Sequence, residues 1–380
     1  MRVLVANIPL PTNRYLVDLN SALSELCVLN HSSEDFWNLR GEYDVVHLHF
    51  PEYLTYEIQD AYINGLTDDL VRAVAERLAY WSTRATIIVT RHNVLPHAAT
   101  SDPRWAAMYE TVYSHADGVV HLANASIDEF EKRYADTPFK RGKRPTHTVV
   151  PIQNYCSLPN NIGATEARRR LGIAEDASVM LVFGAIRHGA ERDLILRTFS
   201  NLTVARKVLL VSKWRETLPD VSWVRLKYWL RDLKRLYYRL RPQYHLNYDF
   251  VTEDDTQLYL NAADVLFIPR LQALNSANLP LGMTFGKVVV GPDTLNVGEL
   301  LRDTGNPAFD PARPETAAAA VERGFLLAQD GHTGANNRKI ALSRWDVNEC
   351  AARYLAFFRD VSDRVSTSSQ GTTTMTAAPN

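Results

Sequence analysis

The stretch LVFGAIRHGAERDLILRTF, residues 181–199, decides the fold because it changes from a strand pattern to a helix pattern within a few residues. A short apolar run ends at Gly184, and a polar loop follows it. An amphipathic helix then runs through Leu194, Leu196 and Phe199. This order of strand, glycine, loop and helix predicts one βα unit of a parallel sheet.

The same pattern recurs on both sides of this stretch. Short apolar runs rich in β-branched residues alternate with longer amphipathic stretches, which is typical of parallel strands that are joined by helices and buried on both faces. The runs that predict strands are residues 2–6, 45–48, 86–90, 118–121 and 146–151, and then 179–183, 207–211, 248–251, 265–268 and 288–290. They predict an α/β protein with two Rossmann-like, doubly wound parallel-sheet domains that face each other across a cleft.

The 380 residues are too many for one compact core and suit two domains. We expect a first domain at 1–155, a turn-rich linker at 156–175 and a second domain at 176–345. A helix at 346–365 is expected to pack back toward the first domain. The tail at 366–380 is rich in Ser and Thr without periodicity, which predicts disorder.

Composition favours a globular protein of a reducing compartment. Hydrophobic residues make up 46% of the chain, enough for large cores without metals or disulfides. The net charge of -1 gives no field that would gather nucleic acid, so we expect no such partner. Cys27, Cys156 and Cys350 lack metal-ligand spacing and predict three buried thiols. The N-terminus lacks the apolar length of a signal peptide, and no run approaches the roughly 18 apolar residues of a membrane span. We therefore expect a cytoplasmic protein.

Titratable side chains gather where two predicted strands of the first domain end, and ligands of such sheets bind outside the carboxyl ends of strands. His47 and His49 share one face of the strand in DVVHLHFPEY. The loop in VTRHNVLPH contributes Arg91, His92, Asn93 and His97. Polar groups at strand ends are costly unless they are paired or used, so His92 is the first candidate for catalysis and His49 the second.

These residues can also have a purely structural role. His47 and His49 can equally be half-buried histidines that hydrogen-bond to the backbone. Together with Glu52 they lie close enough to suggest a metal site, but no third strong set of ligands is evident. We therefore expect no bound metal.

Two loops of the second domain suit a phosphate group. Gly184 is followed by Arg187 and Arg192 near a helix start, which is a reasonable cradle for a diphosphate. After the strand at 265–268, the polar residues Asn275, Ser276, Ala277 and Asn278 open a short helix that stops at Gly286. Free N–H groups at a helix start carry partial positive charge, which favours an anion. The alternative is that the arginines are merely solvated.

These stretches together resemble the glycosyltransferase family 4 group of GT-B enzymes over most of the chain. DVVHLHFP and VTRHNVLPH resemble the family's acceptor-side loops, THTVVPIQNY the last strand of its first domain, and FGAIRHGAERDLI its diphosphate-binding loop. LYLNAADVLFIPR followed by FGKVVVGPDTLNVGEL resembles its C-terminal block.

The resemblance implies transfer of a hexose from a nucleotide diphosphate sugar to a saccharide or lipid-linked saccharide acceptor, in exopolysaccharide or capsule synthesis. It implies that Gly184, Arg187, Arg192 and residues 275–278 bind the donor, and that Glu299 touches nucleotide or sugar hydroxyls. His92 would contact the donor sugar near its reacting carbon, and either His92, His49 or a carboxylate would act as base. His47, Arg91, Asn93 and His97 fall on the acceptor side. No divalent metal and no other cofactor is required.

Two departures separate the chain from the family. Ala273 and Leu281 stand where the family carries a pair of glutamates, and the lysine of the first phosphate loop falls near Ala190. The chain therefore resembles a divergent bacterial polysaccharide branch. Two other functions stay open: a nucleotide-sugar epimerase or hydrolase of the same fold, and a non-catalytic binding subunit, which the missing carboxylates favour.

Residues 223–244, WVRLKYWLRDLKRLYYRLRPQY, interleave basic and aromatic side chains at helical spacing. Such a helix can rest on anionic lipid at the inner face of a membrane, which would suit a lipid-linked acceptor. The alternative is a surface helix of the second domain with a solvated basic face.

Overall fold

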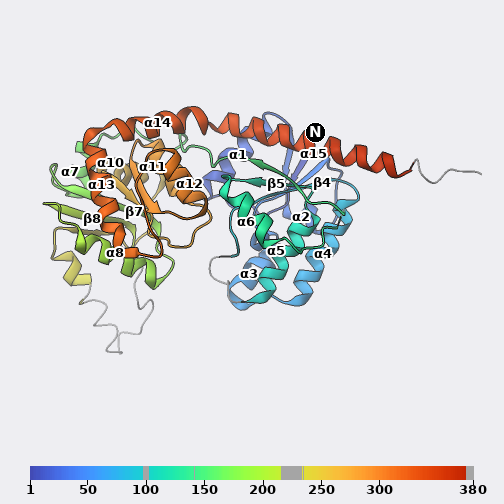
Figure 1. Ribbon diagram of the computed structural model, residues 1–380, viewed down its shortest axis with the longest axis horizontal. Helices are drawn as coiled ribbons and strands as arrows, with labels where there is room; N and C mark the ends of the chain where they lie inside the picture. Colours follow the sequence, from blue (N-terminus) through green and yellow to red (C-terminus); the bar gives the residue numbers. More distant parts are fainter. Residues whose placement is uncertain (97–101, 141, 215–232, 234, 374–380) are drawn as a thin grey trace, which may run out of the picture. The chain divides into compact units, whose positions relative to one another are not determined.

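The structure is a computed structural model that describes residues 1–96, 102–140, 142–214, 233 and 235–373 (Figure 1). The chain divides into two compact units. The first consists of Met1–Gln153 together with Asp346–Asn380, and the second of Asn154–Trp345.

Residues 156–175, expected as a linker, belong to the second unit. They contain the helix α7 (Ala164–Leu171), which packs against α10 (Glu253–Ala262). Arg168 fixes this packing, because its guanidinium donates to the carbonyl oxygen of Ala262 and pairs with Asp264 at 2.9 Å. The stretch is therefore part of the second unit and not a linker between the units.

The sheet of the first unit is parallel throughout, in the order β2-β1-β3-β4-β5-β6. Its strands are β1 (Arg2–Val5), β2 (Val28–His31), β3 (Val45–Leu48), β4 (Thr86–Thr90), β5 (Gly118–His121) and β6 (Thr146–Val149). The sequence did not predict β2, an edge strand with partly exposed side chains and no apolar run. The chain passes from β1 to β2 and then to the other side of β1, so the topological switch point lies between β1 and β3.

Helices cover both faces of this sheet (Figure 1). Val3 and Val45 face α1 (Arg14–Ser24) and α15 (Val347–Thr373), and the alternate residues Leu4 and Val46 face the opposite layer. That layer contains α2 (Ser33–Trp37), α3 (Tyr56–Asn64), α4 (Asp68–Ser82), α5 (Pro103–His115) and α6 (Ala125–Arg133). Burial on both faces explains the continuous apolar runs of the strands.

The helix α15 packs against α1 and β4 within the first unit. It continues to Thr373, so the disorder predicted from residue 366 is wrong for residues 366–373. The hydroxyls of Ser366 and Thr367 donate to the carbonyl oxygens of Ser362 and Asp363, at 2.9 and 2.8 Å. These bonds inside the helix accommodate a Ser/Thr-rich sequence.

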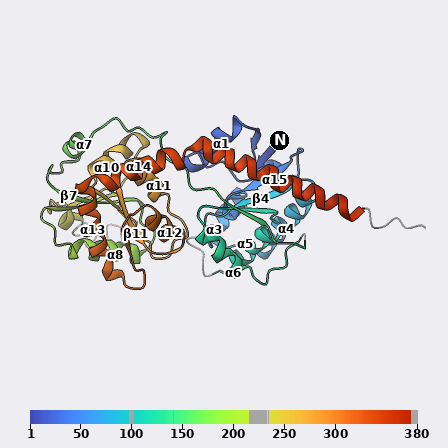
Figure 2. The ribbon, with the colours of Figure 1, turned by 45° about the horizontal axis from the view of Figure 1, so that its top comes forward.

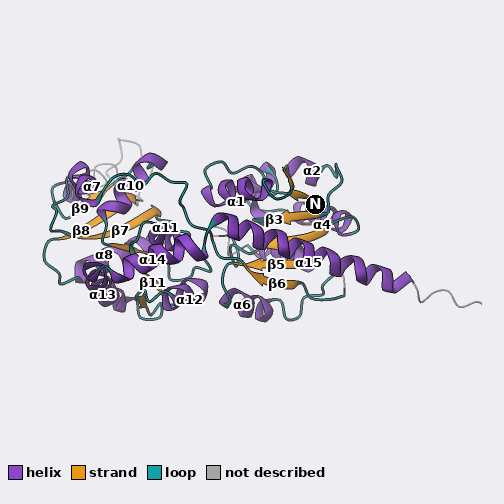
Figure 3. Ribbon diagram, turned by 90° about the horizontal axis from the view of Figure 1, so that it is seen from above, coloured by secondary structure: helices purple, strands orange, loops and turns teal. Residues whose placement is uncertain are grey.

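The sheet of the second unit is also parallel, in the order β12-β11-β10-β7-β8-β9 (Figure 3). Its strands are β7 (Ser178–Ala185), β8 (Lys207–Lys213), β9 (Tyr244–Leu246), β10 (Val265–Phe267), β11 (Val288–Pro292) and β12 (Ala308–Phe309). The chain turns back after β9 and continues on the other side of β7, so the switch point lies between β7 and β10.

The strand predicted at 248–251 was wrong. The last strand on this side of the sheet is β9, and the side-chain amide of Asn247 ends it by donating to the carbonyl oxygens of Ser212 and Asp249, at 2.9 and 3.1 Å. Residues 248–251 therefore contain a bend at Asp249 and form no strand.

Helices again lie on both faces of the second sheet (Figure 2). One face carries α8 (Gly189–Asn201) and α13 (Ala317–Asp330), whose apolar residues join the core of β7 and β10. Helices α11 (Asn278–Thr284) and α14 (His332–Arg344) pack together, and both contact β11, which α12 (Leu295–Asp303) follows. Gly282 lets α11 approach the sheet, because a Cβ there would lie 2.7 Å from Cδ2 of Leu266.

The three cysteines are free thiols. Cys350 is buried and Cys27 is half-buried, whereas Cys156 is exposed. The prediction of burial is therefore wrong for Cys156, which follows the turn at Asn154.

Candidate functional site

The switch point of the first sheet is held by Asn7, which follows β1 and is fully buried. Its side-chain amide donates to the carbonyl oxygen of Phe50 at 2.7 Å, and its Oδ1 accepts the backbone N–H of His49 at 2.8 Å. Both bonds fasten the segment that follows β3. The side chain of Asn7 therefore fixes the backbone that carries the His49 ring.

Three of the four predicted histidines of the first unit form one cluster. Nδ1 of His49 lies 3.0 Å from Nε2 of His92, and the rings of His47 and His49 are 4.2 Å apart. His92 stacks on Phe50 at 4.1 Å between ring centroids. His47 bonds through Nε2 to Thr90 Oγ1 at 2.8 Å.

The members of this cluster differ in exposure. His47 and His49 are buried, whereas His92 is half-buried. Burial lowers the pKa of His47 and of His92 to about 3, and it holds the pKa of His49 well below the ordinary value. All three rings are therefore neutral near pH 7, and His92 is the ring of the cluster that a ligand can reach.

The side chain of Arg91 is not accessible to an acceptor. Its side chain is fully buried, donates to the carbonyl oxygen of Ser126 at 2.8 Å and forms an ion pair with Glu129. It thereby fixes the end of β4 to α6. The expected acceptor-side role is wrong for Arg91.

Asn93 is half-buried and hydrogen-bonds to the carboxyl group of Glu52, which also accepts the Tyr109 hydroxyl at 2.8 Å. Burial raises the pKa of Glu52. Among the described residues, no group of three His, Cys, Asp or Glu side chains could hold a metal ion. The remaining acceptor-side candidate, His97, lies outside the described residues.

A second histidine network was missed by sequence reasoning. Nδ1 of His121 lies 2.8 Å from Ser126 Oγ, and its Nε2 lies 2.9 Å from Nδ1 of His147. Nε2 of His147 lies 2.8 Å from Glu131. His121 is the last residue of β5, and that position was the available signal. The network supports Ser126 and, through it, Arg91.

An open glycine lies next to the switch point of the second sheet, where the pairing of β7 is irregular between Val182 and Ala185. Gly184 has a φ of +85°, and apart from its chain neighbours no described atom lies within 4 Å of the position that a Cβ would take. Its N–H donates to Ser212 Oγ at 2.7 Å. The side chain of Asn278, the first residue of α11, donates to the carbonyl oxygen of Phe183 at 2.7 Å. The end of β7 and the start of α11 therefore lie together.

The predicted arginines differ in their surroundings. Arg187 is half-buried, and its backbone N–H donates to Glu191 Oε2 at 2.8 Å in the first turn of α8. Arg192 pairs with the neighbouring Asp193 at 2.8 Å. Because this carboxylate balances its charge, Arg192 is the weaker candidate for an anion.

The loop before α11 reaches the start of α12. The side-chain amide of Asn296 donates to Oδ1 of Asn275 at 2.6 Å. Ser276 is buried, and its hydroxyl has no hydrogen-bond partner among the described residues. Ala277 precedes α11 and contributes backbone only, and Glu299 is half-buried one turn into α12.

A buried ion pair at this switch point was also missed. Arg270 follows β10, and its side chain is 17% exposed. Its Nε lies 3.6 Å from Oε1 of Glu191, whose side chain is 10% exposed. Burial lowers the pKa of Arg270. The available signal was an arginine directly after a buried strand.

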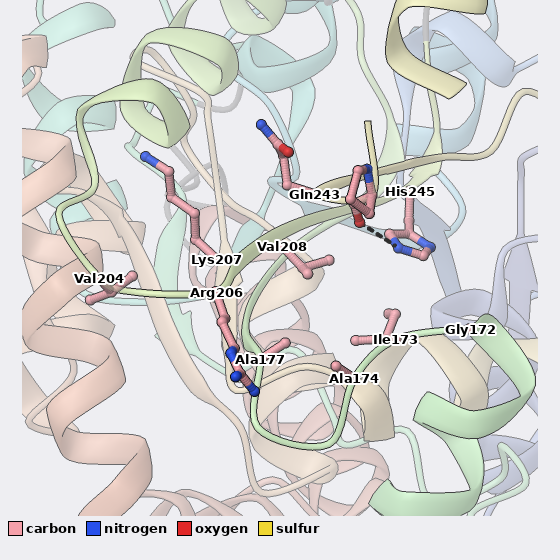
Figure 4. Close-up of a pocket in the computed structure, with 11 residues that line it drawn as sticks. Gly172, Ile173, Ala174, Ala177, Val204, Arg206, Lys207, Val208, Gln243 and His245 are labelled. Atoms are coloured by element: carbon pink, nitrogen blue, oxygen red, sulfur yellow. Dashed lines mark hydrogen bonds between the residues drawn. The ribbon is translucent and has the colours of Figure 1, made fainter. Parts of the chain in front are cut away.

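A pocket of about 480 Å³ lies at the opposite, amino edge of the second sheet (Figure 4). It is lined by Gly172, Ile173, Ala174, Ala177, Val204, Arg206, Lys207, Val208, Pro242, Gln243 and His245. Arg206 pairs with Asp176, and Lys207 donates to the carbonyl oxygens of Ser200 and Leu202. None of the predicted site residues lines this pocket.

No protein-family model and no curated protein sequence matches this chain. Its fold matches solved glycosyltransferases of the GT-B class. Sucrose-phosphate synthase from Thermosynechococcus elongatus is 14% identical, with a TM-score of 0.63, over 95% of this chain and 98% of that one. HepE of Anabaena, solved with UDP-glucose, is 14% identical, with a TM-score of 0.65, over 94% and 99%.

The α,α-trehalose-phosphate synthase of Burkholderia xenovorans, solved with glucose-6-phosphate, is 12% identical, with a TM-score of 0.63, over 94% and 100%. These likenesses confirm the predicted fold class, with two Rossmann-like units of the GT-B type. At such low identity they show the fold alone. Membership of glycosyltransferase family 4 stays a prediction.

Proposed function

We propose that this chain is a glycosyltransferase that takes a hexose from a nucleoside diphosphate sugar. The observation that carries the proposal is the open backbone at Gly184, a glycine with positive φ near the end of β7, beside the switch point of the second sheet. Ligands of doubly wound sheets bind at this position, and backbone N–H groups near a helix start favour phosphate. The fold shared with a structure that binds UDP-glucose supports the same conclusion.

The donor would be held by residues of the second unit. Gly184 leaves room for the diphosphate, and Arg187 supplies positive charge, with Arg192 in a lesser role. The buried hydroxyl of Ser276 and the backbone N–H groups of residues 275–278 would offer hydrogen bonds, and Glu299 suits sugar or ribose hydroxyls. Departure of the nucleoside diphosphate develops negative charge, which these groups would stabilise.

His92 would contact the donor sugar near its reacting carbon, and His49 would orient it. The 3.0 Å bond between the two rings fixes the direction of His92. A general base works best with a pKa near the operating pH, whereas the pKa of His92 is about 3. His92 is therefore better suited to hydrogen-bond the reacting sugar than to remove the acceptor's proton.

The acceptor would be a saccharide or a lipid-linked saccharide, and the reaction would serve exopolysaccharide or capsule synthesis without a metal cofactor. Within the described part of the chain, no helix has the length and apolar character to cross a bilayer. Much of the basic segment 223–244 lies outside the described residues. In its described part, Leu233, Leu236, Tyr237 and Leu240 are exposed, which supports contact with a cytoplasmic membrane face.

A transfer assay tests the proposal. The protein is incubated with UDP-, GDP-, ADP- and dTDP-hexoses, with and without saccharide and lipid-linked acceptors, and release of nucleoside diphosphate is measured. We expect release that depends on an acceptor. His92→Ala should lower kcat by about a hundredfold or more, whereas His332→Ala, on the exposed surface of α14, should not change it.

Other outcomes select other functions. Consumption of the donor without an acceptor indicates an epimerase or hydrolase. Binding without turnover indicates a non-catalytic subunit. Ala273 and Leu281, both buried in the second unit, favour this last outcome because they replace the family's carboxylates with apolar side chains.

A further inference from the structure

Arg270 places a largely buried guanidinium at the switch point of the second sheet, where its contacts to oxygen atoms are long. A guanidinium has five N–H donors, and typical N–H···O distances are about 2.9 Å. Arg270 pairs with Glu191 at 3.6 Å and donates to the Ala185 carbonyl oxygen at 3.5 Å, both longer than that. A largely buried cation with such long contacts is costly. The site is therefore suited to a stronger anion.

Glu191 lies where that anion would be expected. Its carboxylate is in the first turn of α8, where the helix dipole favours negative charge. One oxygen accepts the backbone N–H of Arg187, and the other faces Arg270. The carboxylate thus joins the loop after Gly184 to the residue that follows β10.

We infer that Glu191 occupies the place of the donor diphosphate and that Arg270 exchanges Glu191 for the diphosphate when a nucleotide sugar binds. The inference rests on the proposed function. A diphosphate offers more charge than one carboxylate, and guanidinium groups bind phosphate oxygens in pairs. The long contact to Glu191 makes this exchange easy.

Calorimetric titration with UDP, GDP, ADP and dTDP tests the exchange, and the matching monophosphates are the reference ligands. Arg270→Gln should lower the affinity for the preferred diphosphate about ten- to a hundredfold. It should change the affinity for the monophosphate much less. Arg313→Gln, on an exposed arginine of the same unit that pairs with Asp310, is the matched control and should bind as the wild type does.

Glu191→Gln separates exchange from a purely structural ion pair. Its amide oxygen can still accept the N–H of Arg187, but it no longer competes for Arg270. We expect tighter binding of the diphosphate. The double variant Arg270→Gln/Glu191→Gln avoids an unpaired buried carboxylate and should bind as weakly as Arg270→Gln.

The outcomes distinguish the inference from the proposed function. If the wild type binds a diphosphate and the double variant binds it equally well, the exchange is overturned and the proposed function stands. Unchanged or weaker binding by Glu191→Gln would also overturn the exchange. If the wild type binds none of the four diphosphates, the proposed function fails and the inference fails with it.

Discussion

His47, His49 and His92 show how a sheet can hold ionisable rings in neutral form. They lie at the carboxyl ends of β3 and β4 and contact one another, with His47 packed against Phe358 and hydrogen-bonded to Thr90. Their low pKa values result first from burial, and for His49 and His92 also from neighbouring histidines. The cluster therefore links the stability of the first unit to pH.

The free energy of unfolding should decrease as the pH falls from 7 to 5. The unfolded state binds a proton at each histidine below about pH 6.5, whereas folded His47 and His92 stay neutral until about pH 3. Each such histidine contributes a slope of about 1.4 kcal/mol per pH unit below its unfolded pKa. Urea unfolding at pH 7, 6 and 5 measures this slope.

Two variants check the assignment. His47→Gln should be less stable at pH 7 but should lose less stability on acidification, because one proton uptake is gone. His332→Gln, whose side chain is 89% exposed, should follow the wild type. An unchanged pH slope for His47→Gln would contradict the account.

Sequence reasoning found the histidines but misjudged Arg91 and missed the Arg270–Glu191 pair. Alternate positions on one strand place His47 and His49 on one face, so their grouping was predictable. Arg91 and His92 are adjacent, yet one enters the core and the other stays half-exposed. The partner of Arg270 comes from the first turn of α8, which follows another strand, and sequence spacing gives no information on that contact.

At the scale of elements, α15 belongs to the framework of the first unit. Tyr354 bonds to Tyr15 at 2.9 Å and to Thr90 at 3.1 Å, and Phe358 is fully buried against His47. The helix thus supports the histidine cluster from behind, although it comes last in the sequence.

Phe358→Ala should destabilise the first unit by about 3–5 kcal/mol, because it removes a buried ring and leaves a cavity beneath α15. Val17→Ala, at a 36% exposed position of α1, should stay within about 0.5 kcal/mol of the wild type. Urea unfolding compares the two. Equal, small losses would show that α15 does not support the unit.

Strands with continuous apolar runs and the edge strand β6 were predictable, whereas the edge strands β2, β9 and β12 were not. β2 has partly exposed side chains, and β12 has two residues. After β9, residues 248–251 suggested a strand, but the chain bends at Asp249, whose carbonyl oxygen accepts the side-chain amide of Asn247. Pairing with neighbouring strands therefore defines these short strands, and local sequence patterns do not show such pairing.

At the scale of the whole molecule, this chain shares its fold with proteins whose sequences are very different from its own. The structures that share it are 12–14% identical over more than nine tenths of the chain. Alternating strands and helices in two blocks were enough to predict the fold class. The boundary between the two units was harder to predict, because the turn-rich residues 156–175, expected as a linker, belong to the second unit.

Hydrogen exchange with and without nucleotide sugars tests the central claim most directly. UDP-glucose, GDP-mannose and ADP- and dTDP-glucose are each added in excess, and amide protection is mapped along the chain. We predict that at least one of them protects residues 183–192 and 270–299, around the switch point of the second sheet. Protection confined to 172–177, 204–208 and 242–245, at the amino edge of that sheet, or no protection by any of them, would contradict the account.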